Sequence, residues 1–245
     1  MRSVAVFAVA LAALSVAACQ QHADANFDAR VKAYLMSHPE ELRAALDNMQ
    51  SKEEAAQETD EARDDAKAQA ALPSLRGPLE HDPRDFVANP DGKVTVTEFY
   101  DYRCPHCINI APKVVSLIRS HPDVRFVFKE MPIFGATSEH AARAAMAAKA
   151  QGKDYVGLYE AFMSARPLTD DEIDRIAASK GIDVAAMNAP ATVAKDNAQL
   201  AATADLARKL AIDGTPGFVV GDQFVRGEDD EALNQAIAAA QKGKG

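Results

Sequence analysis

The chain is poor in tryptophan, cysteine, positive charge and long apolar stretches, and each of these shortages excludes a class of protein or site. Among its 245 residues there is no Trp, and there are only three cysteines. The formal net charge is −9, so the chain lacks the basic surface on which binding to nucleic acid depends. The apolar stretch at residues 4–16 is shorter than the roughly 20 residues that a membrane-spanning helix needs. Neither a nucleic acid partner nor a spanning helix is therefore expected.

The N-terminal stretch instead predicts export. Residues 1–18 begin with a positive charge at Arg2, continue with an apolar core and end in small residues, which is the plan of a bacterial secretory signal. The sequence "VAAC" at 16–19 resembles the cleavage site of bacterial lipoproteins. The resemblance implies that Cys19 is acylated, which would place the protein in the periplasm on a lipid anchor. Plain cleavage near Ala18 is the alternative.

The cysteine count agrees with that prediction. Three cysteines in an exported protein leave one thiol over, and acylation of Cys19 accounts for it. Cys104 and Cys107 then remain as a Cys-x-x-Cys pair, in an oxidising compartment where a disulfide is permitted.

Residues 19–78 are predicted to form a helical arm and a charged linker. Apolar residues recur at helical spacing in 27–35 and again in 42–49. Residues 51–69 have Ala as their only apolar residue type, and "LPSLRGP" (72–78) is expected to break the helix. The two stripes are too small to form a core alone, so we expect a homo-oligomer through residues 27–50. Packing against the chain's own domain and a plain spacer are the alternatives.

Residues 79–245 are predicted to form one α/β domain. A strand at 93–100, a helix at 105–121 and a strand at 123–130 make a βαβ unit. A helical insert follows at about 131–211, with helices at 138–151, 155–165, 169–180 and 192–212. A hairpin at 218–225, which turns at Gly221 and Asp222, and a closing helix at 229–242 complete the domain.

Other roles for the Cys-x-x-Cys pair have little support. A structural zinc site needs four ligands, but there is no second such pair, and His81, His121 and His140 have no ligand spacing. Ile108 stands where a c-type haem site needs His. A disulfide across so short a loop removes little entropy from the unfolded chain, so a purely structural role is also disfavoured.

A redox role has positive support. Cys104 is expected at the N-terminus of the 105–121 helix, where the helix dipole favours a thiolate. His106 adds a hydrogen-bond donor or a positive charge beside it. Cys107 lies one turn further along the helix and suits the role of the resolving cysteine. A stabilised thiolate at Cys104 would make the disulfide an oxidant.

The motifs "EFYDYRCPHC" and "GTPGFVVG" resemble the DsbA-like thiol–disulfide oxidoreductases of the thioredoxin superfamily. The resemblance covers residues 79–245 and implies a thioredoxin fold with an inserted helical domain. It further implies a Cys104-Pro105-His106-Cys107 active site. Pro216 would be the cis-proline that faces it, with the backbone of Thr215 free to pair with a substrate chain. Glu98 would be a buried acid that takes a proton from Cys107.

The N-terminal "VKAYLMSHPEELRAAL" resembles the arm of the ScsC/Com1-like subgroup, which makes dimers or trimers. The resemblance implies an enzyme that exchanges disulfides with exported cysteine-containing proteins, aided by a membrane redox partner and without a metal or other cofactor. Pro105-His106 resembles the oxidases, whereas Thr215 resembles the isomerases and reductases, so both activities stay open. A copper-binding thiol protein, since two thiolates suit Cu(I), or a surface antigen without turnover is the alternative.

Overall fold

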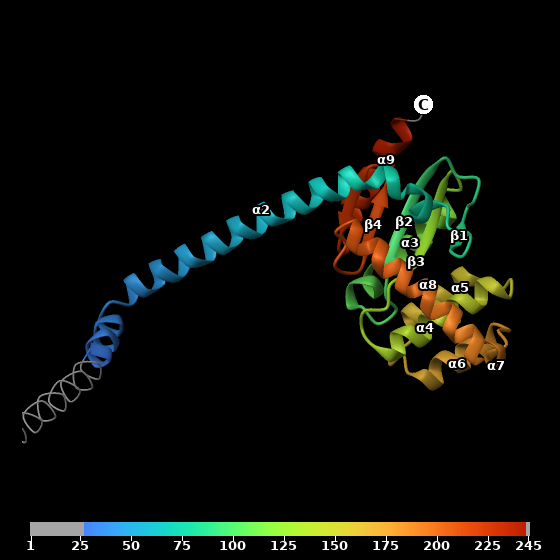
Figure 1. The fold of residues 1–245 in the computed structure, drawn as a ribbon, viewed down its shortest axis with the longest axis horizontal. Coiled ribbons are helices and arrows are strands. Elements are labelled where there is room, and N and C mark those ends of the chain that lie inside the picture. The colour runs from blue at the N-terminus through green and yellow to red at the C-terminus, as the bar shows by residue number, and fades with distance from the viewer. Residues whose placement is uncertain (1–26, 244–245) are drawn as a thin grey trace, which may run out of the picture. The chain divides into compact units, whose positions relative to one another are not determined.

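The computed structural model describes residues 27–243, so the predicted signal and Cys19 lie outside the described residues (Figure 1). The chain divides into two compact units, one up to Ala62 and one from Arg63 onward. Along the described part of the chain, every helix is too short or too polar to cross a membrane.

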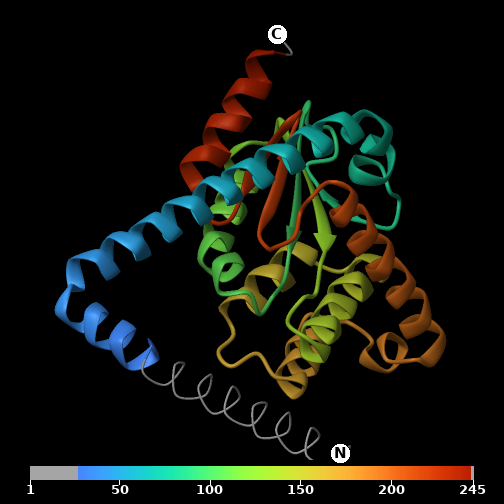
Figure 2. The ribbon, with the colours of Figure 1, turned by 60° about the vertical axis from the view of Figure 1, so that its left-hand side comes forward.

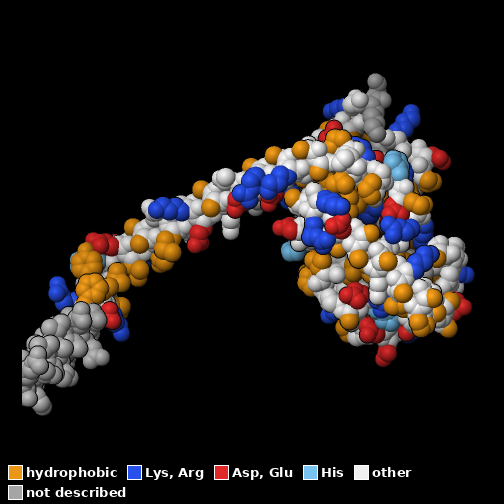
Figure 3. Space-filling view, in the orientation of Figure 1, with side chains coloured by type: hydrophobic (Ala, Val, Ile, Leu, Met, Phe, Trp, Pro, Cys, Tyr) orange, Lys and Arg blue, Asp and Glu red, His pale blue; other side chains and the backbone are white. Residues whose placement is uncertain are grey.

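The first unit consists of helical residues 27–37 and the first half of helix α2 (Pro39–Glu80). Its apolar side chains are exposed, and Figure 3 shows them gathered at this end of the chain. No core forms here within residues 27–62, because each stripe is only two or three turns long. The exposed residues are Phe27, Val31, Tyr34, Leu35, Met36, Leu42, Leu46 and Met49.

Helix α2 corrects the expected break at residues 72–78. It continues to Glu80 although Pro73 and Pro78 lie inside it, at a cost of about 3 kcal/mol for each internal proline. Burial offsets this cost, because Leu72 and Leu79 pack in a core of the second unit. The compact unit therefore begins before residue 79, where the sequence analysis places the start of the domain.

A five-stranded mixed sheet in the order β1-β3-β2-β4-β5 forms the centre of the second unit. Strands β2 (Val94–Tyr100) and β3 (Val124–Glu130) pair in parallel through helix α3 (Pro105–Ser120), which confirms the βαβ unit. Strands β4 (Gly217–Val220) and β5 (Gln223–Arg226) form the expected hairpin, with Gly221 at φ 58° in its turn. Strand β1 (Phe86–Ala88) pairs antiparallel with β3 and was not expected, since three residues carry no periodic pattern.

The helical insert lies between β3 and β4 and contains one helix more than the sequence predicts. Its helices are α4 (Ala136–Ala150), α5 (Tyr155–Ser164), α6 (Asp170–Ser179), α7 (Val184–Met187) and α8 (Pro190–Lys209). The short α7 was missed, because four residues give no helical period. Helix α9 (Asp230–Lys242) closes the chain, and the side chains of Asp154, Thr169 and Asp229 cap α5, α6 and α9.

Helices cover both faces of the sheet. Helices α3, α5 and α9 pack on the face that carries Val96, Phe128 and Val220. The end of α2 and α8 pack on the opposite face, around Phe99 and Val219, and Figure 2 shows both helices against the strands. Because side chains alternate along a strand, the two neighbours of Phe99 point to the first face, toward α3 and α5.

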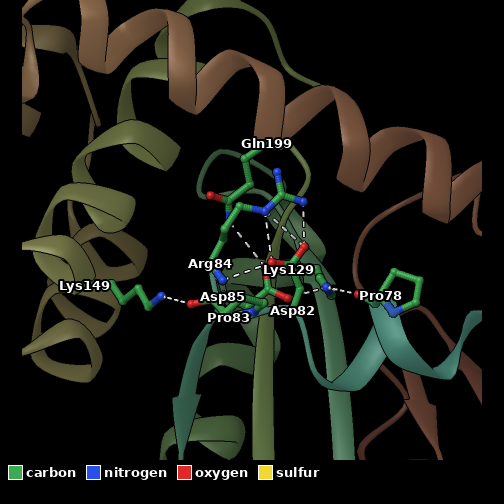
Figure 4. A network of polar contacts seen from close by, with 8 residues as sticks. All are labelled: Pro78, Asp82, Pro83, Arg84, Asp85, Lys129, Lys149 and Gln199. Carbon is green, nitrogen blue, oxygen red and sulfur yellow. Dashed lines mark hydrogen bonds and ion pairs between the residues drawn. The ribbon is translucent and has the colours of Figure 1, made fainter.

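A buried polar network fixes the end of α2 to the sheet (Figure 4). Lys129 of β3 donates to the carbonyl of Pro78 at 2.5 Å and forms a buried ion pair with Asp85. Gln199 of α8 donates to the same carboxyl at 3.3 Å. The ammonium group stands at the C-terminal end of a helix, where a positive charge is favourable. This network joins segments of α2, β3 and α8 on the second face.

Candidate active site

Both cysteines of the motif lie at the start of α3. Cys104 is the N-cap residue in an extended conformation, and Pro105 occupies the first turn, where a missing N–H is tolerated. Both thiols are free and their residues are almost fully buried. The helix thus directs its unpaired N–H groups toward the sulfur of Cys104.

The environment lowers the pKa of Cys104 from 9.0 to about 5. A hydrogen bond from the side chain of Cys107 is the largest cause, and it outweighs burial, which acts in the opposite direction. The backbone N–H groups of Cys107 and His106 lower it further. Cys104 is therefore a thiolate at neutral pH, which is the nucleophilic form.

Cys107 has the opposite character. Burial raises its pKa far above the ordinary value, and the neighbouring Cys104 and Glu98 raise it further. A thiol that holds its proton so firmly needs a base before it can attack a disulfide. The two sulfurs therefore differ as an attacking and a resolving cysteine differ.

The peptide bond between Thr215 and Pro216 is cis, as the family resemblance implies. The sulfur of Cys104 lies 3.1 Å from the carbonyl oxygen of Thr215, which places this loop directly against the active cysteine. A cavity of about 200 Å³ opens beside the loop, lined by residues 212–218 and 224–227. The lining includes Thr215 and Pro216 but no residue of the Cys-x-x-Cys motif.

Glu98 lies on β2 and is 1% exposed. The hydroxyl of Tyr159 on α5 donates to its Oε1 at 3.2 Å, whereas its buried Oε2 has no partner. Burial raises the pKa of Glu98 to about 8, although the Tyr159 hydrogen bond acts to lower it. A carboxyl with this pKa can both take and give a proton near neutral pH.

His106 is placed differently from the other motif residues. Its side chain is 63% exposed, and Nδ1 lies 3.1 Å from Oε1 of Glu228. Its backbone N–H, rather than its ring, is the group that lowers the pKa of Cys104. The ring therefore lies at the exposed rim of the site, beside Glu228.

Asp101, which was not expected from the sequence, joins two loops at the site. Its carboxylate accepts hydrogen bonds from the backbone N–H groups of Arg103 at 2.7 Å, Ile133 at 2.7 Å and Phe134 at 3.0 Å. Its carbonyl accepts from the N–H of Cys104 at 3.2 Å. Its position in the sequence, between a buried strand and the Cys-x-x-Cys motif, could have indicated a role at the site.

A cluster of tyrosines around Glu130 was also missed. Glu130 ends β3 and is 6% exposed. The hydroxyls of Tyr100 and Tyr155 lie 2.5 and 2.6 Å from its Oε1, and Tyr102 lies 3.5 Å from the same atom. The two tyrosines in "FYDYRC" were visible in the sequence, but nothing local pointed to their shared partner.

Side chains that could ligate a metal ion are spread out in the part of the chain that the structure describes. Residues 27–243 contain no group of three or more His, Cys, Asp and Glu side chains that could hold a metal ion. The site therefore offers two thiols, a buried acid and a cis-proline loop as its chemical groups.

Comparisons with known proteins agree with this geometry. A family model for the DSBA-like thioredoxin domain matches residues 95–238. The crystal structure of a thioredoxin-like oxidoreductase from Silicibacter pomeroyi DSS-3 is 40% identical, with a TM-score of 0.62, over 68% of this chain and 98% of that chain. A structure of Proteus mirabilis ScsC in a transitional conformation is 25% identical, with a TM-score of 0.64, over 91% and 97% of the two chains.

Curated relatives match over parts of their length. The thiol:disulfide interchange protein DsbA of Bordetella parapertussis is 31% identical over 140 residues, which cover 55% of this chain and 66% of that protein. The Na(+)/H(+) antiporter NhaA 3 of Salinispora tropica is 28% identical over 178 residues, 71% of this chain but 27% of that protein. The thioredoxin fold expected from the sequence is confirmed, and the expected enzyme class agrees with the name of the first relative. The family match spans more than half of the chain, which therefore belongs to the family of DsbA-like thioredoxin-domain proteins.

Proposed function

We propose that the protein is a thiol–disulfide oxidoreductase that exchanges disulfides with exported proteins through Cys104 and Cys107. The observation that carries this proposal is the opposite perturbation of the two thiols, with the pKa of Cys104 lowered and that of Cys107 raised. A pair held in this way at a helix N-terminus suits disulfide exchange. A thiol pair that only bound a metal would gain nothing from a raised pKa at one ligand, because both ligands must lose their protons.

The chemistry follows from the site. In the disulfide form, a substrate thiolate attacks the sulfur of Cys104, the bond between Cys104 and Cys107 breaks, and a mixed disulfide forms. The sulfur of Cys107 leaves with the electron pair and takes up a proton, for which Glu98 is the buried donor. In the opposite direction Glu98 accepts that proton while Cys107 attacks the mixed disulfide. The backbone of Thr215, beside Pro216, is the proposed contact for the substrate chain.

Whether the enzyme oxidises its substrates or rearranges their disulfides depends on its redox partners and on the N-terminal arm. The lowered pKa of Cys104 stabilises the reduced form, which makes the disulfide a good oxidant and supports an oxidase. The exposed apolar stripes at residues 27–49 support a homo-oligomer, in which several sites would hold one client at high effective concentration, as an isomerase needs. We propose that the oligomer is the isomerase and that the compact unit alone is an oxidase.

The proposed location is the periplasm, with a lipid anchor at Cys19 and a membrane redox partner that resets the cysteine pair. Support comes from the sequence at 1–19 and from a periplasmic thioredoxin-like protein of Salmonella enterica serovar Typhimurium, which is 25% identical over 68% of this chain.

The test is reactivation of a scrambled-disulfide protein in a glutathione buffer, with oxidation of a reduced protein measured in parallel. Residues 20–245 are compared with residues 63–245, because the compact unit begins at Arg63 and needs the second half of α2. We expect both forms to oxidise and only the longer form to reactivate. Cys104→Ser should abolish both activities, and absence of turnover in the unsubstituted chain would favour the thiol-binding alternative.

The matched control is a variant that keeps the arm but lacks part of its apolar stripe. Val31→Ser together with Leu35→Ser leaves the helix length unchanged and removes two exposed apolar side chains. We expect this variant to behave as residues 63–245 do, with a smaller mass by light scattering. An unchanged mass, or reactivation by the monomer, would contradict the proposed role of the arm.

A further inference from the structure

Two buried carboxyls, Glu98 and Glu130, share one face of the sheet. Strands β2 and β3 are parallel, with Glu98 opposite Phe128 and Tyr100 opposite Glu130. Paired residues of neighbouring strands point to the same face, so both carboxyls lie on the face covered by α3 and α5. Burial raises the pKa of each to about 8.

The two carboxyls receive different numbers of hydrogen bonds. Tyr100 and Tyr155 both approach Oε1 of Glu130, and their hydroxyls also lie 2.7 Å from each other. Each hydroxyl has a single proton, which it can give to Oε1 or to the other hydroxyl. A negative charge on Oε1 directs both protons to that oxygen. Glu98 accepts from Tyr159 alone, and its second oxygen has no partner. Because hydrogen bonds to the charged form favour it, Glu130 is the better place for a negative charge.

The pair lies in one continuous cluster, so ionisation of one carboxyl acts on the other. The rings of Tyr100 and Tyr159 are 5.2 Å apart between centroids, which joins the surroundings of the two acids. Like charges in a buried, low-dielectric cluster repel strongly. The titratable groups that face the pair come from β2, the loop after it, α3 and α5: Tyr100, Asp101, Tyr102, Cys107, Tyr155 and Tyr159.

We propose that Glu130 is a positioning residue for disulfide exchange. Of the two carboxyls, Glu130 ionises first, because tyrosine hydroxyls surround its carboxylate. Its negative charge then keeps the proton on Glu98. This inference rests on the proposed function. As a substrate thiolate attacks Cys104 and the disulfide breaks, the departing sulfur of Cys107 takes its proton from Glu98. In the reverse step the Glu98 carboxylate receives that proton back.

Glu130→Gln in the full chain tests the coupling. The substitution keeps the size of the side chain and removes the charge, so Glu98 should ionise at a pH about one unit lower. Carbon NMR of labelled glutamate carboxyls reads this directly. The pH profile for reduction of the enzyme's disulfide by a small thiol should move in the same direction. In a Glu98→Gln background, Glu130→Gln should not move the profile further.

Two tyrosine variants give a matched pair that keeps both carboxyls. Tyr155→Phe removes a donor from Glu130, so Glu98 should ionise at lower pH. Tyr159→Phe removes the donor from Glu98, so Glu98 should ionise at higher pH. The pH at which Glu98 ionises should therefore shift in opposite directions in these two variants, although both remove a hydroxyl from helix α5. Shifts of the same sign, or none, would overturn the proposal even if Glu130→Gln did not fold.

The outcome is separable from that of the proposed function, because the NMR titration needs no turnover. Failure of the unsubstituted chain to exchange disulfides would reject the oxidoreductase, whatever the carboxyls do. An active, folded Glu130→Gln variant with an unchanged titration of Glu98 and an unchanged pH profile would leave Glu130 a purely structural residue.

Discussion

The lowered pKa of Cys104 makes the stability of the reduced protein depend on pH. In the native state Cys104 loses its proton near pH 5, whereas in the unfolded chain it does so near its ordinary value of 9.0. Between these values the unfolded state binds a proton that the native state lacks, so the free energy of unfolding rises with pH. The contribution is fully present above pH 9 and is lost as the pH falls through 5.

The structure sets the size of this effect. The whole shift corresponds to about 5 kcal/mol, at about 1.4 kcal/mol for each pH unit. Pro105 and His106 beside the sulfur are exposed, and solvent there screens the thiolate, so we expect roughly 2–3 kcal/mol. Cys107 contributes little below about pH 8, because its pKa is raised in the native state and the thiol is still protonated in the unfolded chain. Near pH 9 the unfolded chain begins to lose this proton, which opposes a small part of the gain. The disulfide form has no titrating thiol and lacks the effect.

The assay compares denaturant unfolding of the reduced and the disulfide forms at pH 5, 7 and 9 and at constant ionic strength. Groups that titrate alike in both forms cancel in the difference. The reduced form should gain stability relative to the disulfide form at each step, and Cys104→Ser should remove the gain. A difference that is flat or falls with pH would refute the assignment of Cys104 as the thiolate.

Three further predictions concern stability and are checked by denaturant unfolding of the reduced protein. Asp101→Asn should cost about 2–3 kcal/mol, since it weakens charge-assisted bonds to three backbone N–H groups; a loss below 0.5 kcal/mol would contradict the proposed joining of the two loops. Leu72→Ala should cost about 2–5 kcal/mol because Leu72 is buried. Leu46→Ala, at an exposed position of the same helix, should leave the unfolding free energy of the compact unit from Arg63 unchanged. Equal losses in the two variants would contradict the packing of the end of α2 against the sheet. Lys129→Met should cost about 3–5 kcal/mol by leaving Asp85 buried without its partner, and recovery in the double variant with Asp85→Leu would show that the unpaired charge is the cause.

The sequence predicted most of the second unit because its signals are local. Alternating apolar residues mark β2 and β3, and the turn residues Gly221 and Asp222 mark the β4–β5 hairpin. The start of α3 at Pro105 placed both cysteines and the helix dipole together. These features depend on neighbours within a few positions along the chain. The thioredoxin fold and the cis bond at Pro216 came from resemblance to a family rather than from periodicity.

Elements without a local pattern were missed or misjudged. Strand β1 and helix α7 are too short to show a period. The prolines of α2 gave a correct local signal for a helix end, but burial of Leu72 and Leu79 against the sheet outweighed it. Propensity is a weak preference that tertiary contacts can override.

The amino-acid sequence by itself determined which residues could do redox chemistry, because a Cys-x-x-Cys pair at a helix start needs only residues 104–107 and the helix that follows. The tertiary structure alone decided which groups surround the two buried acids. Tyr155 meets Glu130 across 25 residues of sequence, and Tyr159 meets Glu98 across 61. Such contacts exist only once two parallel strands have paired and α5 has packed on them, and the pKa of a buried acid is set by those contacts.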